Sequence, residues 1–246
     1  MALVEELRRA RPNRLLRSTM RRALPSTTCV YTSRRLVALT FDDGPDPRLT
    51  PAVLEVLKAR DVRGTFLLVA ERVRQHPELA KRVSAERHEV GLHGDQHVDM
   101  RGGSFVEQYR ALRRGRRDVE ATTGTRVKWF RPPYGKQEPE TVAACRSAGM
   151  RPLMWSTSGH DWQQVGIEDQ LAHVAAGLRP GAVVLLHDGA ARVADPPPLP
   201  PRTQPQLLEQ LLDLLQFRGL EPVTISELCA VGRPVRAPWF EQWLHH

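Results

Sequence analysis

Two histidines and two adjacent carboxylates are the residues of this chain best suited to hold a metal ion. His93 and His97 are separated by three residues, a spacing that can bring both imidazoles onto one cation from a helix face or a tight loop. Asp42 and Asp43 follow the apolar run Leu36–Phe41, which predicts a buried strand with both acids at its end. Two imidazoles and one carboxylate leave coordination positions open for water, as in catalytic zinc sites. Either motif alone indicates only a polar turn, but together they predict a metal centre.

Hydrolysis is the chemistry that such a centre supports. A divalent cation lowers the pKa of a bound water to about 7, which provides a nucleophile at neutral pH. One aspartate can ligate the cation while its neighbour accepts the proton of the water. His187 follows the apolar run Val183–Leu186 and is the candidate general acid for a leaving amine, unless it is simply a hydrogen-bonded histidine at a strand end.

Further candidate site residues lie near positions 131 and 162. Arg131 precedes Pro132-Pro133-Tyr134-Gly135 and can keep a neighbouring carboxylate ionised. The backbone N–H of Tyr134 is a candidate donor to an oxyanion, in a loop that the two prolines stiffen. Trp155 and Trp162 can stack against a sugar ring, although either can equally belong to the core.

The elements that must position these residues are short apolar strands that alternate with helical patterns. Thr50-Pro51 is expected to cap one helix, and the Leu-rich segment Gln206–Phe217 is expected to form another that ends at Gly219. Residues 195–205 contain six prolines and are expected to form a stiff surface loop. The predicted strands are Leu36–Phe41, Thr65–Val69, Glu89–Leu92, Val127–Phe130, Leu153–Trp155, Ala182–Leu186 and Glu221–Thr224.

Repeated alternation of strand and helix predicts an α/β fold with a parallel sheet, either open and doubly wound or closed as a barrel. In both, the carboxyl ends of the strands converge on one rim, where binding sites are built. We therefore expect the polar clusters that follow the strands to meet at one place.

Composition and charge narrow the classes of function. The chain has 246 residues, of which 41% are hydrophobic and 26% charged, as suits one globular domain with short appendages. Its net charge of +8 is concentrated in the first 36 residues, where nine arginines and two glutamates give +7 and leave +1 for the remaining 210. The basic charge thus belongs to an arm, and we expect no nucleic-acid partner. The three cysteines lack a CxxC spacing, which argues against a cysteine zinc site.

We expect three parts: a basic arm over residues 1–35, a catalytic domain over 36–231 and an aromatic tail over 232–246. Glu5, Glu6 and the arginines that interrupt each apolar stretch do not match a secretory signal, which predicts a cytoplasmic protein. The arm and the tail are candidates for peripheral contact with an anionic membrane. The alternative is a disordered arm and a tail packed on the domain.

Five segments together resemble, in order, the motifs of the NodB-homology polysaccharide deacetylases, carbohydrate esterase family 4. The resemblance extends from about Leu36 to Leu228, which is most of the chain. It implies a distorted (β/α)7 barrel and metal-dependent hydrolysis of N-acetyl groups from N-acetylglucosamine-type oligosaccharides or polysaccharides. The segments are Thr40–Pro45, His93–His97, Arg131–Gly135, Asp161-Trp162 and Leu185–Asp188.

The resemblance also implies a role for each matching residue. The cation is expected to be zinc, with cobalt, nickel, iron and manganese as alternatives for the same donors. Tyr134 and Trp162 are expected to contact substrate, and Leu185 resembles the residue that lines the pocket for the acetyl methyl group. The remaining roles are the general base for Asp42, metal ligation for Asp43, His93 and His97, the general acid for His187, orientation of the base for Arg131, and a charged partner in that network for Asp161.

Two positions depart from the family pattern, and other functions stay open. Gly94 stands where the family usually has Ser or Thr, so no hydroxyl braces that loop, and Ser158 stands where another Asp is common. One alternative is a related metal-dependent hydrolase of a small non-sugar amide or of an O-acetyl ester. Another is a glycan-binding barrel without catalysis, against which the presence of both Asp42 and His187 argues. A non-haem iron oxygenase would share the ligand set, but it would leave His187 without a role.

Overall fold

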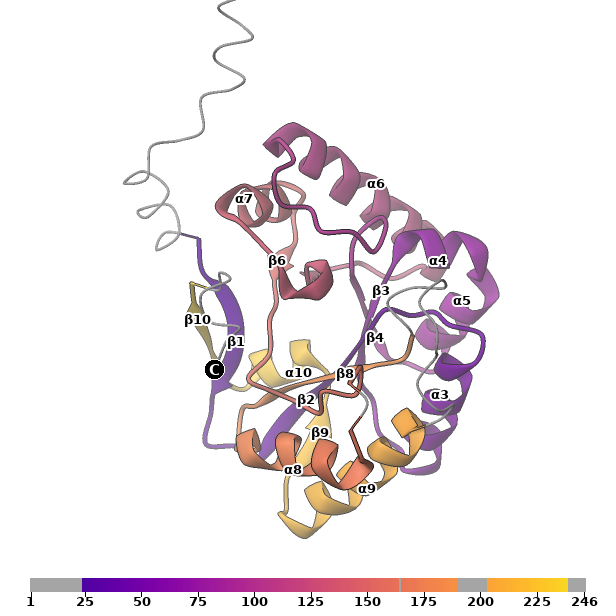
Figure 1. Ribbon diagram of the computed structural model, residues 1–246, viewed down its shortest axis with the longest axis vertical. Helices are drawn as coiled ribbons and strands as arrows, with labels where there is room; N and C mark the ends of the chain where they lie inside the picture. Colours follow the sequence, from indigo (N-terminus) through magenta and orange to yellow (C-terminus); the bar gives the residue numbers. More distant parts are fainter. Residues whose placement is uncertain (1–23, 164, 190–202, 239–246) are drawn as a thin grey trace, which may run out of the picture.

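The computed structural model describes residues 24–163, 165–189 and 203–238, in which strands and helices alternate as the sequence predicts (Figure 1). The strands are β1 (Ser26–Tyr31), β2 (Leu36–Asp42), β3 (Thr65–Leu68), β4 (Glu89–Leu92), β5 (Trp129–Phe130), β6 (Arg151–Pro152), β7 (Thr157–Ser158), β8 (Val183–His187), β9 (Glu221–Val223) and β10 (Arg233–Ala237). The helices are α3 (Leu49–Ala59), α4 (Ala70–Gln75), α5 (Pro77–Ala85), α6 (Phe105–Thr123), the 3-10 turn η1 (Pro133–Gly135), α7 (Pro139–Ser147), α8 (Ile167–Gly177), α9 (Thr203–Phe217) and α10 (Ile225–Ala230).

The main sheet is a curled path of seven strands in the order β6-β5-β4-β3-β2-β8-β7, and β9 pairs with the beginning of β2. Every pairing along this path is parallel. Helices lie outside the sheet, with α3, α4 and α5 on one side and α8 and α9 below in the view of Figure 1. The predicted distorted (β/α)7 barrel is therefore confirmed, as a half-barrel with helices around it.

Strand β2 occupies the middle of the sheet because its residues can be buried on both faces. Six of its seven residues are buried, as expected for a parallel strand covered by helices. Its register pairs Asp42 with His187 of β8 and Thr40 with Leu185. The ends of β2 and β8 thus lie at the same level, which brings the polar residues after them to one rim.

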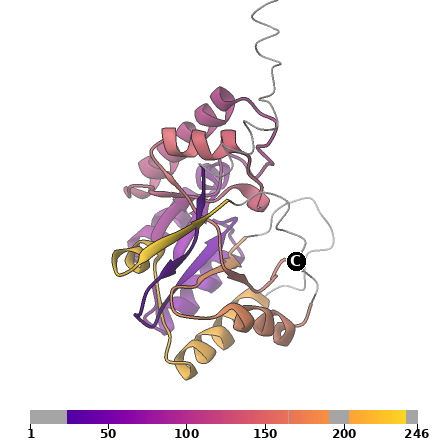
Figure 2. The same cartoon turned by 90° about the vertical axis from the view of Figure 1, so that its left-hand side faces the viewer.

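Strand β1 lies beside the gap between the two edge strands β6 and β7. The N–H of Val30 donates to the carbonyl of Gly181 at 2.8 Å, and the N–H of Met154 donates to the carbonyl of Thr27 at 2.7 Å. β1 pairs antiparallel with β10, and the two strands lie side by side in Figure 2. Parts of the residues assigned to the arm (1–35) and to the tail (232–246) are therefore strands that pack on the barrel.

The predicted strand Leu153–Trp155 is wrong in position, because β6 and β7 flank it instead. The N–H of Leu153 donates to Phe130 of β5, whereas the next N–H donates to Thr27 of β1. Because the consecutive N–H groups of residues 153 and 154 donate to two different strands, this segment forms no continuous ladder with either of them and is not a strand.

Helix α3 is predicted correctly, but its capping residue is not Thr50. The helix begins at Leu49, and the Oδ1 atom of Asp46 accepts from the N–H groups of Arg48 and Leu49 at 2.8 and 3.1 Å. The hydroxyl of Thr50 instead donates to the Oδ2 atom of Asp188 at 2.6 Å. Thr50 thus links this helix to the end of β8 rather than satisfying the helix terminus.

Helix α9 begins at Thr203, inside the range 195–205 that was expected to be a loop. Pro205 fits there because the first N–H groups of a helix have no partner within it. Residues 1–23, 190–202 and 239–246 lie outside the described residues, so the first 23 residues of the arm, the rest of the loop and the aromatic end of the tail stay predictions. Within the described part, the helices are too short or too polar to cross a lipid bilayer.

Candidate active site

Asp43, His93 and His97 form a buried cluster at the rim of the barrel. One ligand atom from each lies within 4.8 Å of the others. Nε2 of His93 is 3.2 Å and Nε2 of His97 is 3.1 Å from the same oxygen, Oδ1 of Asp43. Asp43 follows β2 and His93 follows β4, so two strands of the parallel sheet supply the cluster.

The hydrogen bonds around this cluster indicate that it is built for a cation. Nδ1 of His93 lies 2.9 Å from the backbone carbonyl of Arg131, and because a carbonyl can only accept, Nδ1 carries the hydrogen. In neutral His93 the lone pair of Nε2 then faces Oδ1 of Asp43, a buried oxygen that accepts no hydrogen bond from the described residues. Two acceptors facing each other repel unless a positive charge lies between them. Ligand atoms of a tetrahedral zinc site are about 3.3 Å apart, close to the 3.2 and 3.1 Å that separate Oδ1 of Asp43 from Nε2 of His93 and of His97.

The same surroundings keep Asp43 in its ligating, ionised form. Burial alone would raise the pKa of Asp43, but protons on the facing nitrogens of His93 and His97 and the charge of His187 hold that pKa well below the usual range, and a cation between these atoms would take the place of those protons. The donor set of one carboxylate and two imidazoles suits zinc and several other divalent ions.

A second layer of contacts fixes the backbone that carries Asp43. This residue has a left-handed φ of 77°, and Nη1 of Arg72 donates to its carbonyl at 2.7 Å. The N–H of Gly44 donates to Oδ1 of Asp188 at 3.2 Å. A Cβ at Gly44 would overlap that carboxylate, so glycine is required for the close approach. Burial raises the pKa of Asp188 to about 7, although the hydrogen bond from Thr50 opposes this shift.

Sequence reasoning missed the roles of Arg72, Thr50 and Asp188 in supporting the cluster. Asp188 adjoins His187 in one of the recognised motifs, which is the signal that could have drawn attention to it. Arg72 and Thr50 lie within ordinary helical patterns, and only the fold brings them to Asp43 and Asp188.

The other aspartate, Asp42, is held by a fully buried arginine. Nη1 of Arg131 donates to Oδ1 of Asp42 at 2.7 Å, while its guanidinium also donates to the hydroxyl of Thr40 and to the carbonyl of Met154. Burial lowers the pKa of Arg131, and the charge of Asp42 opposes that shift. Oδ2 of Asp42, 3.7 Å from Nδ1 of His93, is the oxygen left for chemistry.

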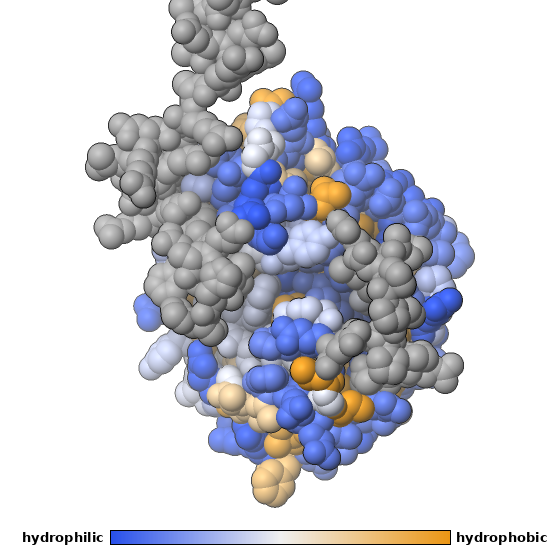
Figure 3. All heavy atoms as spheres, in the orientation of Figure 1, coloured by the Kyte–Doolittle hydropathy of each residue, from blue (hydrophilic) through white to orange (hydrophobic). Residues whose placement is uncertain are grey.

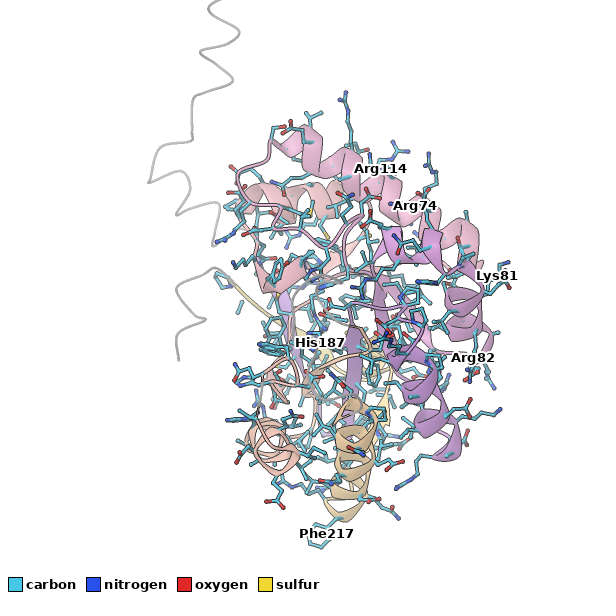
Figure 4. All side chains as sticks on the ribbon, turned by 45° about the vertical axis from the view of Figure 1, so that its right-hand side comes forward. Arg74, Lys81, Arg82, Arg114, His187 and Phe217 are labelled. Carbon is cyan, nitrogen blue, oxygen red and sulfur yellow. The ribbon has the colours of Figure 1, made fainter. Side chains whose placement is uncertain are left out.

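His187 ends strand β8, where it pairs with Asp42 of the neighbouring strand β2, and it lies near the middle of the molecule in Figure 4. Its Nδ1 lies 2.7 Å from Oδ1 of Asp161, and its backbone N–H donates to the other oxygen of that carboxylate at 2.8 Å. Burial alone would lower the pKa of His187, but Asp161 and the charges of Asp43 and Asp42 raise it to about 10. The imidazole is therefore protonated at neutral pH and has a proton to donate at Nε2.

The three predicted substrate contacts surround these groups. Tyr134 is 41% exposed with a left-handed φ of 59°, and its ring packs edge-on against His97 at 4.4 Å. Trp162 is 45% exposed and lies edge-on to His187 at 5.2 Å. Leu185 is buried on β8, two residues before His187, level with Thr40. The described surface is hollowed near the centre of the face drawn in Figure 3 and is largely hydrophilic around the hollow.

The structure shows the local role of Gly94 and Ser158, the two residues that depart from the family pattern. Gly94 has a φ of +96°, and a Cβ there would come within 2.7 Å of the carbonyl oxygen of Gln96. This turn therefore favours glycine over a residue with a side chain. Ser158 accepts a hydrogen bond from the N–H of His160 at 3.1 Å and so shapes the segment before Asp161.

Comparisons with known proteins agree with this geometry. The family model for polysaccharide deacetylase matches residues 30–153. A chitooligosaccharide deacetylase from Bradyrhizobium is 37% identical over 156 residues, covering 63% of this chain and 71% of the relative. A peptidoglycan-N-acetylglucosamine deacetylase from Bacillus cereus is 32% identical over 208 residues, covering 81% of this chain and 90% of the relative.

Two solved structures add information about metal and activity. A family 4 acetyl xylan esterase from Clostridium thermocellum, solved with a cobalt ion, has a TM-score of 0.70 and 31% identity over 79% of this chain and 90% of the esterase chain. BA3943 from Bacillus anthracis, described as a CE4 family pseudoenzyme, has a TM-score of 0.74 and 27% identity over 85% of this chain and 70% of its own. Because one of these neighbours is a pseudoenzyme, the fold alone does not establish activity, and the side chains must decide it.

Proposed function

The chain belongs to the polysaccharide deacetylase family, and we propose that it is a metal-dependent hydrolase that removes N-acetyl groups from N-acetylglucosamine-type oligosaccharides or polysaccharides. One observation supports this proposal above the others. An arginine-held carboxylate (Asp42) and an aspartate-held imidazole (His187) lie on neighbouring strands, beside the Asp43-His93-His97 cluster. A glycan-binding barrel has no use for this base and acid.

We propose zinc as the resident cation, held by Asp43, His93 and His97. When bound, the cation supplies a Lewis acid that polarises the acetyl carbonyl and lowers the pKa of a water molecule. Imidazole and carboxylate donors suit zinc, and they also admit cobalt, nickel, iron or manganese. The carbonyl of Arg131 fixes the ring tautomer of His93, so its Nε2 is directed at the site.

Asp42 is the proposed general base. Arg131 donates to Oδ1 of Asp42, which leaves Oδ2 to take the proton of the water that attacks the acetyl carbonyl. The contacts of Arg131 with Thr40 and Met154 prevent the guanidinium from moving away during this transfer. Adjacent aspartates thus serve different roles because different partners surround them.

His187 is the proposed general acid. Its Nδ1 is tied to Asp161, which leaves Nε2 to donate a proton to the sugar nitrogen as the carbon–nitrogen bond breaks. Products are acetate and the free amine of the sugar. Trp162 and Tyr134 are the proposed walls for the sugar ring, and Leu185 is the proposed apolar contact for the acetyl methyl group.

Acetate release tests the proposal directly. Protein stripped with a chelator is expected to release acetate from N-acetylated chitooligosaccharides only after a divalent ion is restored, and Asp43→Asn is expected to abolish that recovery. Asp213→Asn, an exposed position on α9 paired with Arg60, is the matched control and is expected to behave as the wild type. Glycan binding without acetate release under every metal would refute the hydrolase and support a non-catalytic barrel.

A second substrate class follows from the acetyl xylan esterase neighbour. An O-acetyl ester needs the same nucleophile, but its alcohol leaving group depends less on protonation than an amine does. Acetylated xylan and small amides belong in the same assay. If acetylated xylan or a small amide is turned over faster than chitooligosaccharides, the proposed substrate is wrong, whereas the proposed metal chemistry still holds.

A further inference from the structure

The two histidines of the metal cluster are held in different ways. His93 directly follows strand β4, and its Nδ1 lies 2.9 Å from the carbonyl of Arg131. His97 lies further along the loop after β4, and its buried Nδ1 forms no hydrogen bond with any described residue. Apart from an edge-on contact with the ring of Tyr134, the position of the His97 imidazole therefore depends on the backbone of this loop.

Asp95, which lies between the two histidines, is held by arginines from two different helices. The residue is only 6% exposed, and a buried carboxylate needs partners for its charge and its hydrogen bonds. Nη1 of Arg74 on α4 donates to Oδ1 of Asp95 at 3.0 Å, and Nε of Arg114 on α6 donates to Oδ2 at 3.0 Å. Figure 4 shows Arg74 and Arg114 near each other on these two helices. The carboxylate thus joins the loop to α4 and to α6.

The beginning of α4 also holds the backbone of this loop. The first N–H groups of a helix have no partner within the helix, and those of residues 69–71 donate to segments that carry metal ligands. In chain order, they donate to the carbonyls of Gly44, Gly94 and Asp95 at 2.9, 3.0 and 2.8 Å. Gly44 follows the ligand Asp43, so α4 connects the segments on both sides of the metal site.

Helix α6 packs on the same loop from the other side. A Cβ at Gly115 would lie 3.2 Å from the Cα of Asp95 and 3.3 Å from the Cβ of Ala70, so the helix contacts both the loop and the beginning of α4. This close approach brings Arg114, the preceding residue of α6, within hydrogen-bond distance of the carboxylate.

We propose that Asp95 is a positioning residue for the metal site, and that its ion pairs with Arg74 and Arg114 fix the loop that carries His97. The loop then holds Nε2 of His97 at 3.1 Å from Oδ1 of Asp43. Both oxygens of Asp95 accept from arginines, so its carboxylate acts through His97 rather than as a ligand. This inference rests on the proposed metal-dependent function. If Asp95 served only the stability of the fold, its replacement would leave the zinc affinity of the folded protein unchanged.

The zinc affinity of the folded protein tests this role, measured by competition with a chromogenic chelator after circular dichroism has confirmed folding. Asp95→Asn is expected to weaken zinc binding by about tenfold, since contacts behind metal ligands typically contribute 10–100-fold. Its NH2 group would face an arginine where a carboxylate oxygen now accepts. Asp118→Asn, which removes another acceptor of Arg74 but lies on α6, is the matched control and is expected to bind zinc as the wild type does. Equal affinities of these two variants would overturn the proposal.

A second pair of variants covers the case in which Asp95→Asn does not fold. Arg114→Gln changes a side chain that is 53% exposed, and it is expected to weaken zinc binding by less than Asp95→Asn because Arg74 still holds the carboxylate. Arg110→Gln changes an exposed arginine one turn earlier on α6 and is expected to retain the wild-type affinity. Equal affinities of Arg114→Gln and Arg110→Gln would contradict the role of the ion pair.

A double variant tests whether Asp95 acts through His97. In the His97→Ala background, Asp95→Asn is expected to cause no further loss of zinc affinity, because the ligand that it positions is already absent. A further loss as large as in the wild-type background would refute the proposed route.

Acetate release from chitooligosaccharides separates this inference from the proposed function. If Asp95→Asn loses zinc affinity as expected but the metal-loaded wild type releases no acetate, the deacetylase proposal fails and the role of Asp95 stands. If acetate is released and Asp95→Asn binds zinc as the wild type does, the role of Asp95 fails and the enzyme stands.

Discussion

His187 retains its proton because Asp161 faces it. Without that carboxylate, burial alone would lower the pKa of His187, whereas the structure with Asp161 raises it to about 10. The carboxylate accepts from both the ring and the backbone N–H of His187, so it also fixes the orientation of the imidazole. Asp161 therefore acts through His187 as a positioning residue and does not itself touch the reacting atoms.

Asp161→Asn is expected to move the alkaline limb of kcat/KM to lower pH by more than one unit. The proton of His187 is needed for catalysis and is lost as pH rises through its pKa, and the substitution removes the charge that raises this pKa. The pH–rate profile of the metal-loaded protein measures the shift. A bound cation offsets part of the charge of Asp43, so the wild-type limb is expected below pH 10. An unchanged limb in the variant would show that His187 is not the group whose deprotonation stops the reaction.

At the scale of elements, helix α3 supports the metal centre through one hydroxyl. Thr50 donates to Asp188, which accepts from the N–H of Gly44 and so fixes the turn that carries Asp43. Thr50→Val is expected to weaken zinc affinity by about tenfold, since contacts behind metal ligands typically contribute 10–100-fold. Thr50→Ser keeps the hydroxyl and is expected to retain the affinity. Competition with a chromogenic chelator measures both variants, and equal affinity of the Val and Ser variants would refute the role of this contact.

The β1–β10 ribbon makes a second contribution at this scale, because it covers the core near the open edge of the barrel. Val30 of β1 is 2% exposed and packs in a core cluster with Leu153 and Val183, whereas Val235 of β10 is 39% exposed. Val30→Ala is expected to lower the free energy of unfolding by about 1–3 kcal/mol through lost packing. Val235→Ala is expected to change it by less than about 0.5 kcal/mol. Denaturant unfolding distinguishes the two, and equal losses would show that the ribbon does not pack as described.

The sequence predicts features that depend on neighbouring residues, but it does not predict contacts between residues that lie far apart along the chain. Local apolar runs predict buried strands such as Leu36–Phe41. The parallel pairing of these strands brings the residues after them to one rim. The turn around Asp43 depends instead on Thr50, Arg72 and Asp188, which are polar residues without a local pattern. The ribbon pairs residues 26–31 with 233–237, and a pairing across nearly the whole chain leaves no signal in either segment alone.

At the scale of the whole molecule, the metal centre depends on the intact fold, because its ligands follow separate strands of one sheet. Oδ1 of Asp43 and Nε2 of His93 lie 3.2 Å apart only while β2 and β4 keep their places in the sheet. A cation that binds the folded chain and not the unfolded one adds RT ln(1 + [metal]/Kd) to stability, about 4 kcal/mol at a thousandfold excess over Kd. Zinc is therefore expected to raise the Tm of chelator-treated protein by several degrees. Asp43→Asn is expected to remove that increase, while Asp213→Asn keeps it. Differential scanning calorimetry across a zinc titration measures the effect, and an equal rise in Tm for all three proteins would place the ion somewhere other than this cluster.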